Sequence, residues 1–402
     1  MLQEAIQSIN QKRMKKNIYI FIVIGIILVS ACKGTKTEES NMDIIEIDLD
    51  QAKQISFTEW FDSIQIVPLE TTDQSLIKGY FGLPDQVIFY GDLIYIFDEQ
   101  LRHILVFDNN GKFINSTSHL RGQGPSEYTG VADFDVNDLT GNLIISNPPT
   151  EIIIYNTDLE FVSRHDMSNN LWPVSGIKLI SNDIALFYNS RKEDNELVNV
   201  FSIKENKVIK KICPIENGGK AKRTISTRLN YNFYKINDTL CFIPRFSHNQ
   251  VFYYDPVKVE FFPRMEFKIK QNAFSSSKLS QNQNDSYYNI DILKSNDYAF
   301  LYDIKETDRY YFSSILYREK TYINKYDKVT GKNQVIDLPF LERQTLSPDM
   351  LIKDNVLYQF IPAPDAGFDV RNIKHLSEKN IRILENMSED DNPCIVKIFI
   401  KD

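Results

Sequence analysis

Short runs of β-favouring residues alternate with turn sequences along most of the chain. The first four runs are 87–90, 93–98, 104–108 and 113–115. Gly91-Asp92 between the first two is typical of a two-residue β-hairpin, and Asn109 to Lys112 makes a second turn. The pattern therefore predicts one four-stranded antiparallel meander.

The same order of strands and turns recurs along the chain. The second copy has runs at 133–136, 142–146, 151–155 and 159–162. Further copies begin near residues 176, 231, 288 and 350, and three of their third strands are 198–202, 250–255 and 322–327. Repeated strands that end in an aromatic residue and an Asp or Asn fit blades that bury both faces against neighbours. We expect an all-β fold, a six-bladed β-propeller of four-stranded antiparallel blades.

The two ends of the repeat region predict how the ring closes. Residues 64–69 and 394–400 are β runs that would otherwise leave two exposed sheet edges, so we expect them to share one blade. Residues 375–387 place Ile381, Leu384 and Met387 at helical spacing. This segment predicts one short helix packed on the outside of the ring.

The N-terminus has the pattern of an export signal. Met14-Lys15-Lys16 precedes an apolar run that is too short for a bilayer span of ~20 residues and that ends at Ser30-Ala31-Cys32. We expect Cys32 to carry a lipid that anchors the chain in the membrane. The alternative is an ordinary signal peptide or membrane helix with a chance cysteine. Residues 1–31 are then an upstream extension plus signal peptide, 32–42 a flexible tether and 43–402 the propeller.

Charge and cysteine content exclude several classes of protein. The net charge of −8 becomes −11 without residues 1–31, which hold four basic residues and one acidic residue, so no nucleic-acid partner is expected. Cys213, Cys241 and Cys394 are too few and too widely spaced for a disulfide scaffold; one pair is possible, but small buried side chains are favoured. No zinc-binding pattern is present, so we expect no metal. We also expect no cofactor and a monomer.

Two motifs carry a resemblance to known proteins. The stretch DEQLRHILVFDNNGKFI, residues 98–114, resembles an NHL repeat. The motif RGQGPSEY at 121–128, together with 61–79, resembles the six-bladed β-propeller lipoproteins of gut Bacteroidetes, whose motif reads GQGPGEY. Ser126 departs from it, and serine tolerates positive φ poorly. The resemblance implies the fold and a place in the cell envelope, either periplasmic or on the surface, without implying a mechanism.

The loop 121–128 supplies the first candidate binding residues. It joins the last strand of one predicted blade to the first strand of the next, near the channel mouth where propellers bind ligands. Its candidate contacts to a sugar or peptide are Arg121, Gln123, Glu127 and Tyr128. The alternative is structural, with Arg121 bonding carbonyl groups and Glu127 capping the loop.

Other candidates lie apart from this loop. Asp133 and Asp135 flank Phe134 at strand spacing and would either hold a cation or line the channel. Trp172, before Pro173, is a candidate for stacking on a sugar, and Arg309, within an expected insertion at 305–313, would reach over the same face. For each, a core, rim or solvated role is the alternative.

These residues favour a binding or scaffolding module over an enzyme. The five histidines, at 103, 119, 165, 248 and 375, are scattered, and only His119 lies beside a candidate site. The leading hypothesis is a lipid-anchored envelope propeller that binds a glycan, a peptide or a partner envelope protein. The alternatives are a lyase or hydrolase acting at the channel mouth and an interaction protein working through its rim.

Overall fold

The computed structural model describes most of the chain after residue 41. The described residues are 42–79, 83–167, 176–188, 198–212, 233–244, 249–274, 297–337, 351–364, 370 and 375–401. The expected lipid site Cys32, the start of the expected fourth and fifth copies near 231 and 288, and residues Trp172, Cys213 and His248 lie outside them.

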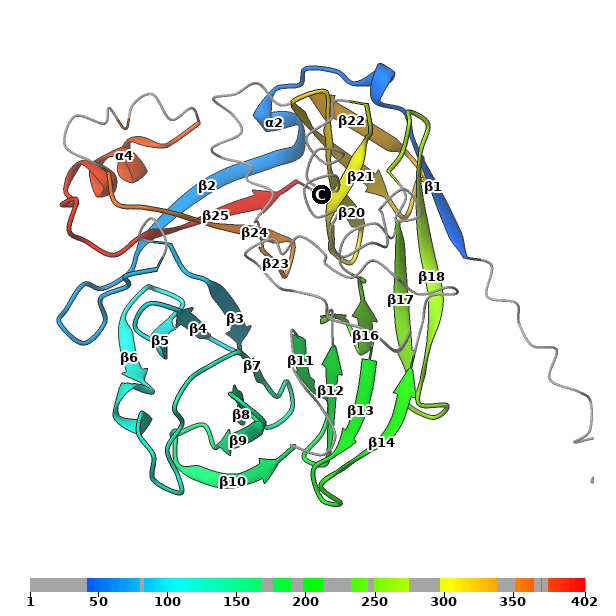
Figure 1. Ribbon diagram of the computed structural model, residues 1–402. Helices are drawn as coiled ribbons and strands as arrows, with labels where there is room; N and C mark the ends of the chain where they lie inside the picture. Colours follow the sequence, from blue (N-terminus) through cyan, green and yellow to red (C-terminus); the bar gives the residue numbers. More distant parts are fainter. Residues whose placement is uncertain are drawn as a thin grey trace, which may run out of the picture. The chain divides into compact units, whose positions relative to one another are not determined.

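Six antiparallel sheets stand around a common axis, as Figure 1 shows, which confirms the predicted six-bladed propeller. Blade 1 contains β3 (Gln86–Tyr90), β4 (Leu93–Asp98), β5 (His103–Asp108) and β6 (Phe113–Ser116). Blade 2 contains β7 (Asp133–Val136), β8 (Leu143–Asn147), β9 (Glu151–Tyr155) and β10 (Phe161–Asp166). Blade 3 contains β11 (Gly176–Leu179), β12 (Ile184–Tyr188), β13 (Val198–Ser202) and β14 (Lys207–Ile212).

The other three blades continue the ring. Blade 4 contains β15 (Phe233–Ile236), β16 (Thr239–Phe242), β17 (Gln250–Asp255) and β18 (Glu260–Ile269). Blade 5 contains β19 (Phe300–Glu306), β20 (Tyr310–Tyr317), β21 (Lys320–Asp327) and β22 (Asn333–Asp337). Blade 6 contains β23 (Leu351–Lys353), β24 (Val356–Ile361), β25 (Cys394–Ile400) and β2 (Phe61–Pro68).

The core lies between the blades. Hydrophobic clusters fill each of the interfaces between neighbouring sheets, including the one between blade 6 and blade 1. In blade 2, Ile144 packs toward blade 3 whereas Ile145 packs toward blade 1, because successive side chains of a strand point to opposite faces. Both faces are buried, which explains why the middle strands are continuously apolar rather than alternating.

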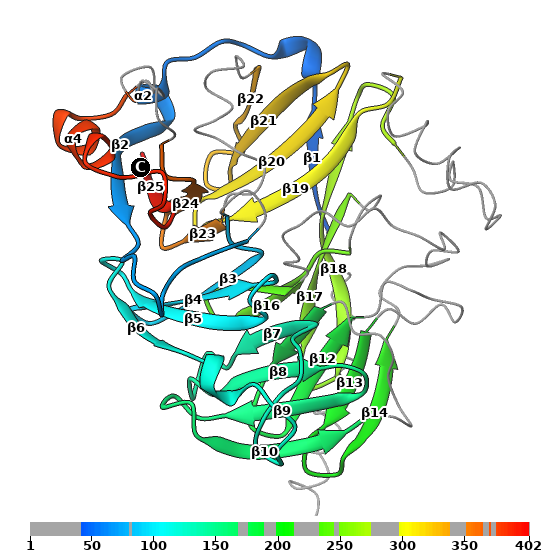
Figure 2. The same cartoon turned by 60° about the vertical axis from the view of Figure 1, so that its left-hand side comes forward.

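The two ends of the chain close the ring as predicted. β2 pairs antiparallel with β25 from Phe61 opposite Ile400 to Pro68 opposite Cys394, so the outermost strand of blade 6 comes from the N-terminal side of the chain (Figure 2). Blade 6 thus combines β2 from the N-terminal part of the chain with three strands from its C-terminal part, so it does not lack its outer strand.

Blades 5 and 2 each correct one expectation about strand positions. The residues expected to form an insertion, 305–313, are instead the end of β19, a three-residue turn and the start of β20. Residues 310–317 pair in register with β21 over their whole length, so they belong to the sheet. In blade 2 the last strand begins at Phe161 rather than at residue 159, because Leu159 has a φ of 64° within the preceding turn.

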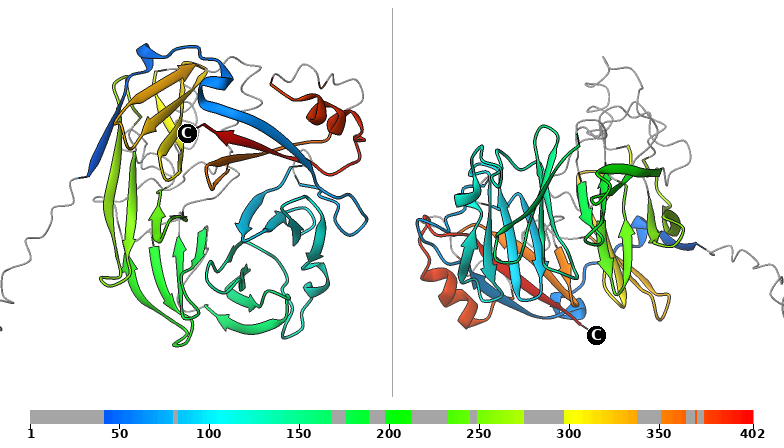
Figure 3. Two further views of the ribbon diagram at one scale, coloured as in Figure 1. Left: turned by 180° about the vertical axis from the view of Figure 1, so that it is seen from behind. Right: turned by 90° about the horizontal axis from the view of Figure 1, so that it is seen from below.

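An additional strand, β1 (Asp43–Ile47), was not predicted. It runs parallel to β18 as a fifth strand of blade 4, as the view from behind in Figure 3 shows. Ile45 and Ile47 are buried between blades 4 and 5, and the Asn333 Nδ2 of blade 5 donates to the Glu46 carbonyl at 2.5 Å. A parallel bridge from Lys53 to Ile336 in β22 follows. This N-terminal segment therefore joins two blades from outside.

The predicted C-terminal helix is present as α4 (Glu378–Glu385), with Ser377 as its N-cap. Leu384 packs into the core of blade 6, and the short helix α2 (Phe57–Trp60) precedes β2. Asn380 of α4 accepts from the Ile66 N–H at 3.2 Å and donates to the Ile64 carbonyl at 2.7 Å, so it satisfies the free edge of β2. In the described part of the chain, no helix is long and apolar enough to cross a membrane.

The antiparallel order gives the propeller two distinct ends. The turns between first and second strands, such as 91–92 and 354–355, and those between third and fourth strands lie at one end, which we call the turn face. The connections between blades, such as 117–132, and the turns between second and third strands lie at the other end, the loop face.

Removing the polar cover of the β2 edge is expected to destabilise the propeller. Asn380→Leu keeps the size of the side chain but leaves the Ile66 N–H and the Ile64 carbonyl without partners, which costs about 1–3 kcal/mol for each buried group. We expect the free energy of unfolding in urea to fall accordingly. Lys379→Leu, at an exposed neighbouring position, is the control and should change it by less than about 0.5 kcal/mol. Equal effects would contradict the edge-capping role.

Candidate functional site

A cavity of about 1000 Å³ occupies the centre of the ring. The first strands of all six blades line it, and so do residues of the turn face, including Gly91, Asp138, Asn237, Asp308 and Asp354. The cavity is therefore placed toward the turn face, opposite the loop 121–128. Its position follows from topology, because the innermost strands have one edge that no other strand of their sheet covers.

Aromatic and aliphatic side chains of blade 1 form one wall of the cavity. Phe89 and Tyr90 lie on β3, and the Phe89 ring packs on Tyr358 of blade 6 with centroids 4.5 Å apart. The Lys353 Nζ lies 5.8 Å from the centre of the Phe89 ring and donates to the Gly91 carbonyl at 2.7 Å. This wall offers an apolar surface beside hydrogen-bonding groups, which is the usual composition of a ligand pocket.

Lysines from four successive blades line the rest of the cavity: Lys178, Lys235, Lys305 and Lys353. Lys178 is paired with Asp135 at 3.1 Å and Asp138 at 3.4 Å, and Lys305 is paired with Asp303 at 2.7 Å. Lys235 is exposed and forms no ion pair with the described residues. It therefore brings an exposed positive charge to the cavity.

A buried polar cluster joins blades 4 and 5 at the cavity wall. The Glu306 side chain is fully buried, and Arg264 donates to both of its oxygens, at 2.9 and 2.7 Å. The Lys328 Nζ at 3.0 Å and the Tyr234 hydroxyl at 2.8 Å also donate to it. Burial and the Glu306 charge raise the pKa of Tyr234 well above its ordinary value. Because the donors occupy both oxygens, Glu306 holds the two blades together rather than serving as a free base.

Asp133 and Asp135 connect blade 2 to blade 3. The Asp133 carboxylate accepts from the Ile177 N–H and the Asp135 carboxylate from the Leu179 N–H, each at 2.7 Å. These donors belong to the inner edge of β11, so the carboxylates replace a missing neighbouring strand. Burial raises the pKa of Asp133 to about 7 and that of Asp135 to about 6. Both side chains act in packing between blades, and only Asp135 also lines the cavity.

The loop 121–128 makes the contacts that its structural alternative predicted. The Arg121 Nη1 donates to the Leu101 carbonyl at 2.9 Å, and the Glu127 Oε2 accepts from the Gly124 N–H at 2.8 Å. Tyr128 is fully buried, and its hydroxyl lies 2.7 Å from the Thr117 Oγ1. These contacts fix the loop as the connection between blades 1 and 2.

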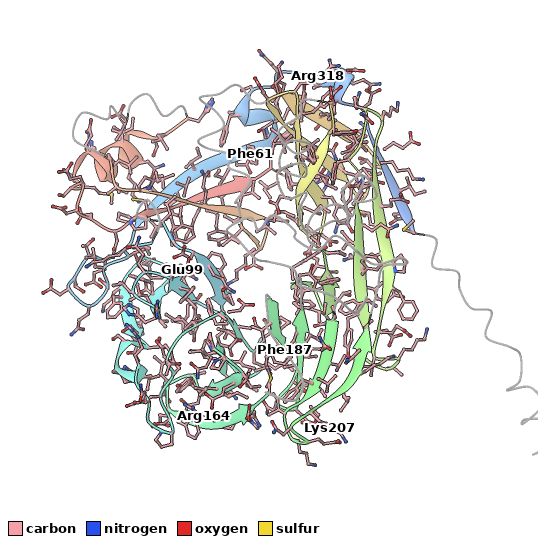
Figure 4. The ribbon with its side chains drawn as sticks, in the orientation of Figure 1. Phe61, Glu99, Arg164, Phe187, Lys207 and Arg318 are labelled. Atoms are coloured by element: carbon pink, nitrogen blue, oxygen red, sulfur yellow. The ribbon has the colours of Figure 1, made fainter. Side chains whose placement is uncertain are left out.

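Neighbouring residues hold the same loop against blade 2. Arg164 on β10, labelled in Figure 4, donates to the Glu127 carbonyl and pairs with Glu151 at 2.8 Å. A Cβ at position 122 would lie 1.8 Å from the Glu127 side chain, which explains the glycine there. Ser126 is not among the described residues with positive φ, so its departure from the family motif causes no strain.

The remaining predicted residues do not converge with this loop. Gln123 is exposed on the loop face. Arg309 lies in the β19–β20 turn and pairs with Asp327 at 3.0 Å, so it is on the turn face and not over the loop 121–128 as expected. The expectation that Arg309 reaches over the same face was wrong, because its segment forms a hairpin turn rather than a long insertion.

Histidine and cysteine side chains form no reactive group within the described ranges. Burial lowers the pKa of His103 and of His165. Burial also raises the pKa of Cys241, and it raises the pKa of Cys394 to about 12. Both cysteines are free and buried, as favoured from the sequence. Among the residues that the structure describes, no three His, Cys, Asp or Glu side chains are grouped to hold a metal ion.

Sequence reasoning missed the cavity lysines and the Glu306 cluster. One signal was available, because Lys178, Lys235 and Lys353 all lie in short first strands of predicted blades, just before a turn. No comparable signal exists for Glu306, whose partners Arg264 and Tyr234 are 42 and 72 positions away. Only the stacking of blades brings them together.

Comparisons with known proteins support the fold. The family described as Domain of unknown function (DUF4934) matches residues 41–399. The crystal structure of a candidate exported protein from Bacteroides fragilis NCTC 9343 is similar, with a TM-score of 0.69 and 18% identity over 89% of this chain and 100% of that one. A member of the DUF4221 family from Bacteroides vulgatus ATCC 8482 has a TM-score of 0.48 and 14% identity, over 85% and 97%. None of the curated proteins matches the chain.

The buried Asp133 predicts a specific dependence of stability on pH. Its folded-state pKa of about 7 lies above the ordinary value of 3.8, so the folded state binds the proton more tightly and loses stability as pH rises from 4 through 7. Asp133→Asn cannot ionise. We expect urea unfolding at pH 4 and pH 8 to show that the wild type loses about 3 kcal/mol more than the variant.

The control for this experiment is Asp158→Asn, at an exposed position in the turn before β10. Its pH dependence should follow the wild type to within about 0.5 kcal/mol. Parallel curves for the wild type and Asp133→Asn would show that burial does not raise the pKa of this carboxyl.

Proposed function

The chain belongs to the DUF4934 family, and we propose that it is a lipid-anchored binding module of the cell envelope whose central cavity takes a glycan or peptide ligand. The cavity of about 1000 Å³ carries this proposal. It combines the aromatic wall of Phe89 and Tyr90 with the exposed charge of Lys235, and such a mixture suits a ligand with both apolar and polar groups.

The hydrogen bonds that the buried carboxylates accept support binding rather than catalysis. Asp133 and Asp135 accept from the backbone of the next blade, and Glu306 accepts from Arg264, Lys328 and Tyr234. A lyase or hydrolase needs an acid or base that is free to exchange a proton with its substrate. These groups hold blades in place, so the fold uses them for rigidity. A rigid ring around a cavity suits recognition of a preformed ligand shape.

The loop face is proposed as a second contact region. Arg121 and Gln123 are exposed there. Trp172 lies in the connection from blade 2 to blade 3 and is proposed as a stacking residue, although it is outside the described residues. A ligand longer than the cavity would reach this face. A partner envelope protein would bind at this end rather than inside the ring.

Removing the charge of Lys235 tests the cavity as the binding site. We expect calorimetric titration of ligands, first identified by thermal stabilisation against glycan and peptide panels, to show about tenfold or weaker binding for Lys235→Gln. Lys112→Gln, an exposed lysine on the rim of blade 1, is the matched control and should bind as the wild type does. Unchanged affinity in both variants would place the ligand outside the cavity.

A separate experiment tests the lipid anchor. We expect Cys32→Ala to move the protein from the membrane fraction to the aqueous fraction, because two acyl chains are needed for stable anchoring and the variant cannot receive them. Mass spectrometry of the purified wild type should find the acyl groups on the peptide that begins with Cys32. An unmodified Cys32 in the mature membrane-bound protein would contradict the anchor.

A further inference from the structure

The most exposed large apolar side chains of the described chain share one end of the propeller. Val257 is 91% exposed, Val329 is 79% exposed and Leu139 is 73% exposed, whereas no other such side chain exceeds 51%. Each of the three lies in a hairpin turn on the turn face. Scattered exposure of single apolar residues is ordinary, but the three highest values at one end of a ring are not scattered.

Val257 and Val329 occupy equivalent turns of neighbouring blades 4 and 5. In the first turn, the Asp255 Oδ1 accepts from the N–H groups of Val257 and Lys258 at 2.8 and 3.0 Å. In the second, the Asp327 Oδ1 accepts from Val329 at 2.9 Å and from Thr330 at 3.2 Å. The carboxylates thus fix both turns and hold each valine at the tip.

Basic side chains flank these two tips. Lys258 follows Val257 and its side chain is 60% exposed, and Lys332 is exposed at the end of the Val329 turn. The Asp255 Oδ2 lies 3.9 Å from the Lys258 Nζ, and Glu260 lies 3.9 Å from Lys210. Asp327 accepts within its own turn, whereas Asp308 in the β19–β20 turn is exposed. An exposed apolar tip next to an exposed lysine has the composition of an interfacial membrane contact, in which the cation faces anionic headgroups.

The predicted tether enters the fold at the same two blades. β1 lies on β18, the strand that follows the Val257 turn, and runs parallel to it, so its N-terminal end is directed toward that turn. Asp43 is opposite Met265, eight positions after Val257, a distance of ~26 Å along a strand. The ten residues 33–42 can span up to ~35 Å, which is enough for these turns to reach a bilayer holding the lipid.

We propose that the turns carrying Val257 and Val329, with Lys258 and Lys332, form a contact surface for the lipid bilayer, so that the turn face of blades 4 and 5 rests on the membrane. This inference rests on the proposed lipid anchor. Two valines bind a bilayer weakly by themselves, but an anchor at close range gives them a high effective concentration of membrane. The contact would hold the propeller in one orientation beside the bilayer.

Site-specific fluorescence tests this surface. Val257→Cys, Val329→Cys and, on the loop face, Gln123→Cys are labelled with an environment-sensitive dye in a Cys213→Ser background. The lipidated full chain is placed in vesicles of phosphatidylethanolamine and phosphatidylglycerol. We expect labels at 257 and 329 to be shielded at least threefold from aqueous iodide, and the label at 123 to remain as accessible as in solution. Equal accessibility at all three positions would overturn the proposal.

A second arm separates this surface from the lipid anchor. The chain from residue 33, with an N-terminal hexahistidine, is captured on vesicles that contain nickel-chelating lipid. Shielding at 257 and 329 in this arm supports the surface even where Cys32 carries no lipid. Adding Val257→Glu to the chain labelled at 329 should abolish the shielding, whereas adding Gln123→Glu should not. Shielding that survives Val257→Glu would overturn the proposed contact.

Discussion

Each blade of this propeller has edges whose backbone N–H and C=O groups need partners, and satisfying those edges is the constraint on which the rest of the structure depends. Different groups meet it at different places. At the inner edge of blade 3, the carboxylates of Asp133 and Asp135 accept from β11. At the outer edge of blade 6, the Asn380 side chain accepts from one backbone N–H of β2 and donates to one backbone carbonyl of β2. At the outer edge of blade 4, β1 adds a parallel strand.

The same constraint shapes the central cavity. Many polar side chains near the axis form hydrogen bonds or ion pairs between blades, as the Glu306 cluster and the Lys178 pair show. Only a smaller set of side chains remains to contact a ligand. That set combines one aromatic wall with Lys235 and the groups at the turns. The hydrogen bonds and ion pairs between blades therefore fix most of the polar groups on the wall of this pocket.

The local sequence pattern was sufficient to predict most of the strands. The hairpin at Gly91-Asp92, the apolar middle strands and the helix around Leu384 are properties of neighbouring residues, so they are visible in the chain itself. The turn at 307–309 was missed because a short polar stretch between aromatic runs resembles an insertion as much as a hairpin. β1 was missed because a single strand beyond the repeat has no partner nearby in the sequence.

The chain by itself determined the all-β class, the six-bladed ring and its closure, because these depend on periodicity and on residue types. It favoured buried cysteines but left one disulfide open, and the structure shows Cys241 and Cys394 free. Only the tertiary structure decided which candidate residues meet. It placed Arg309 and the loop 121–128 at opposite ends, and it brought Glu306 to Arg264 and Tyr234. The physical reason is that contacts between blades join residues far apart in sequence, and no local preference encodes which faces will pack together.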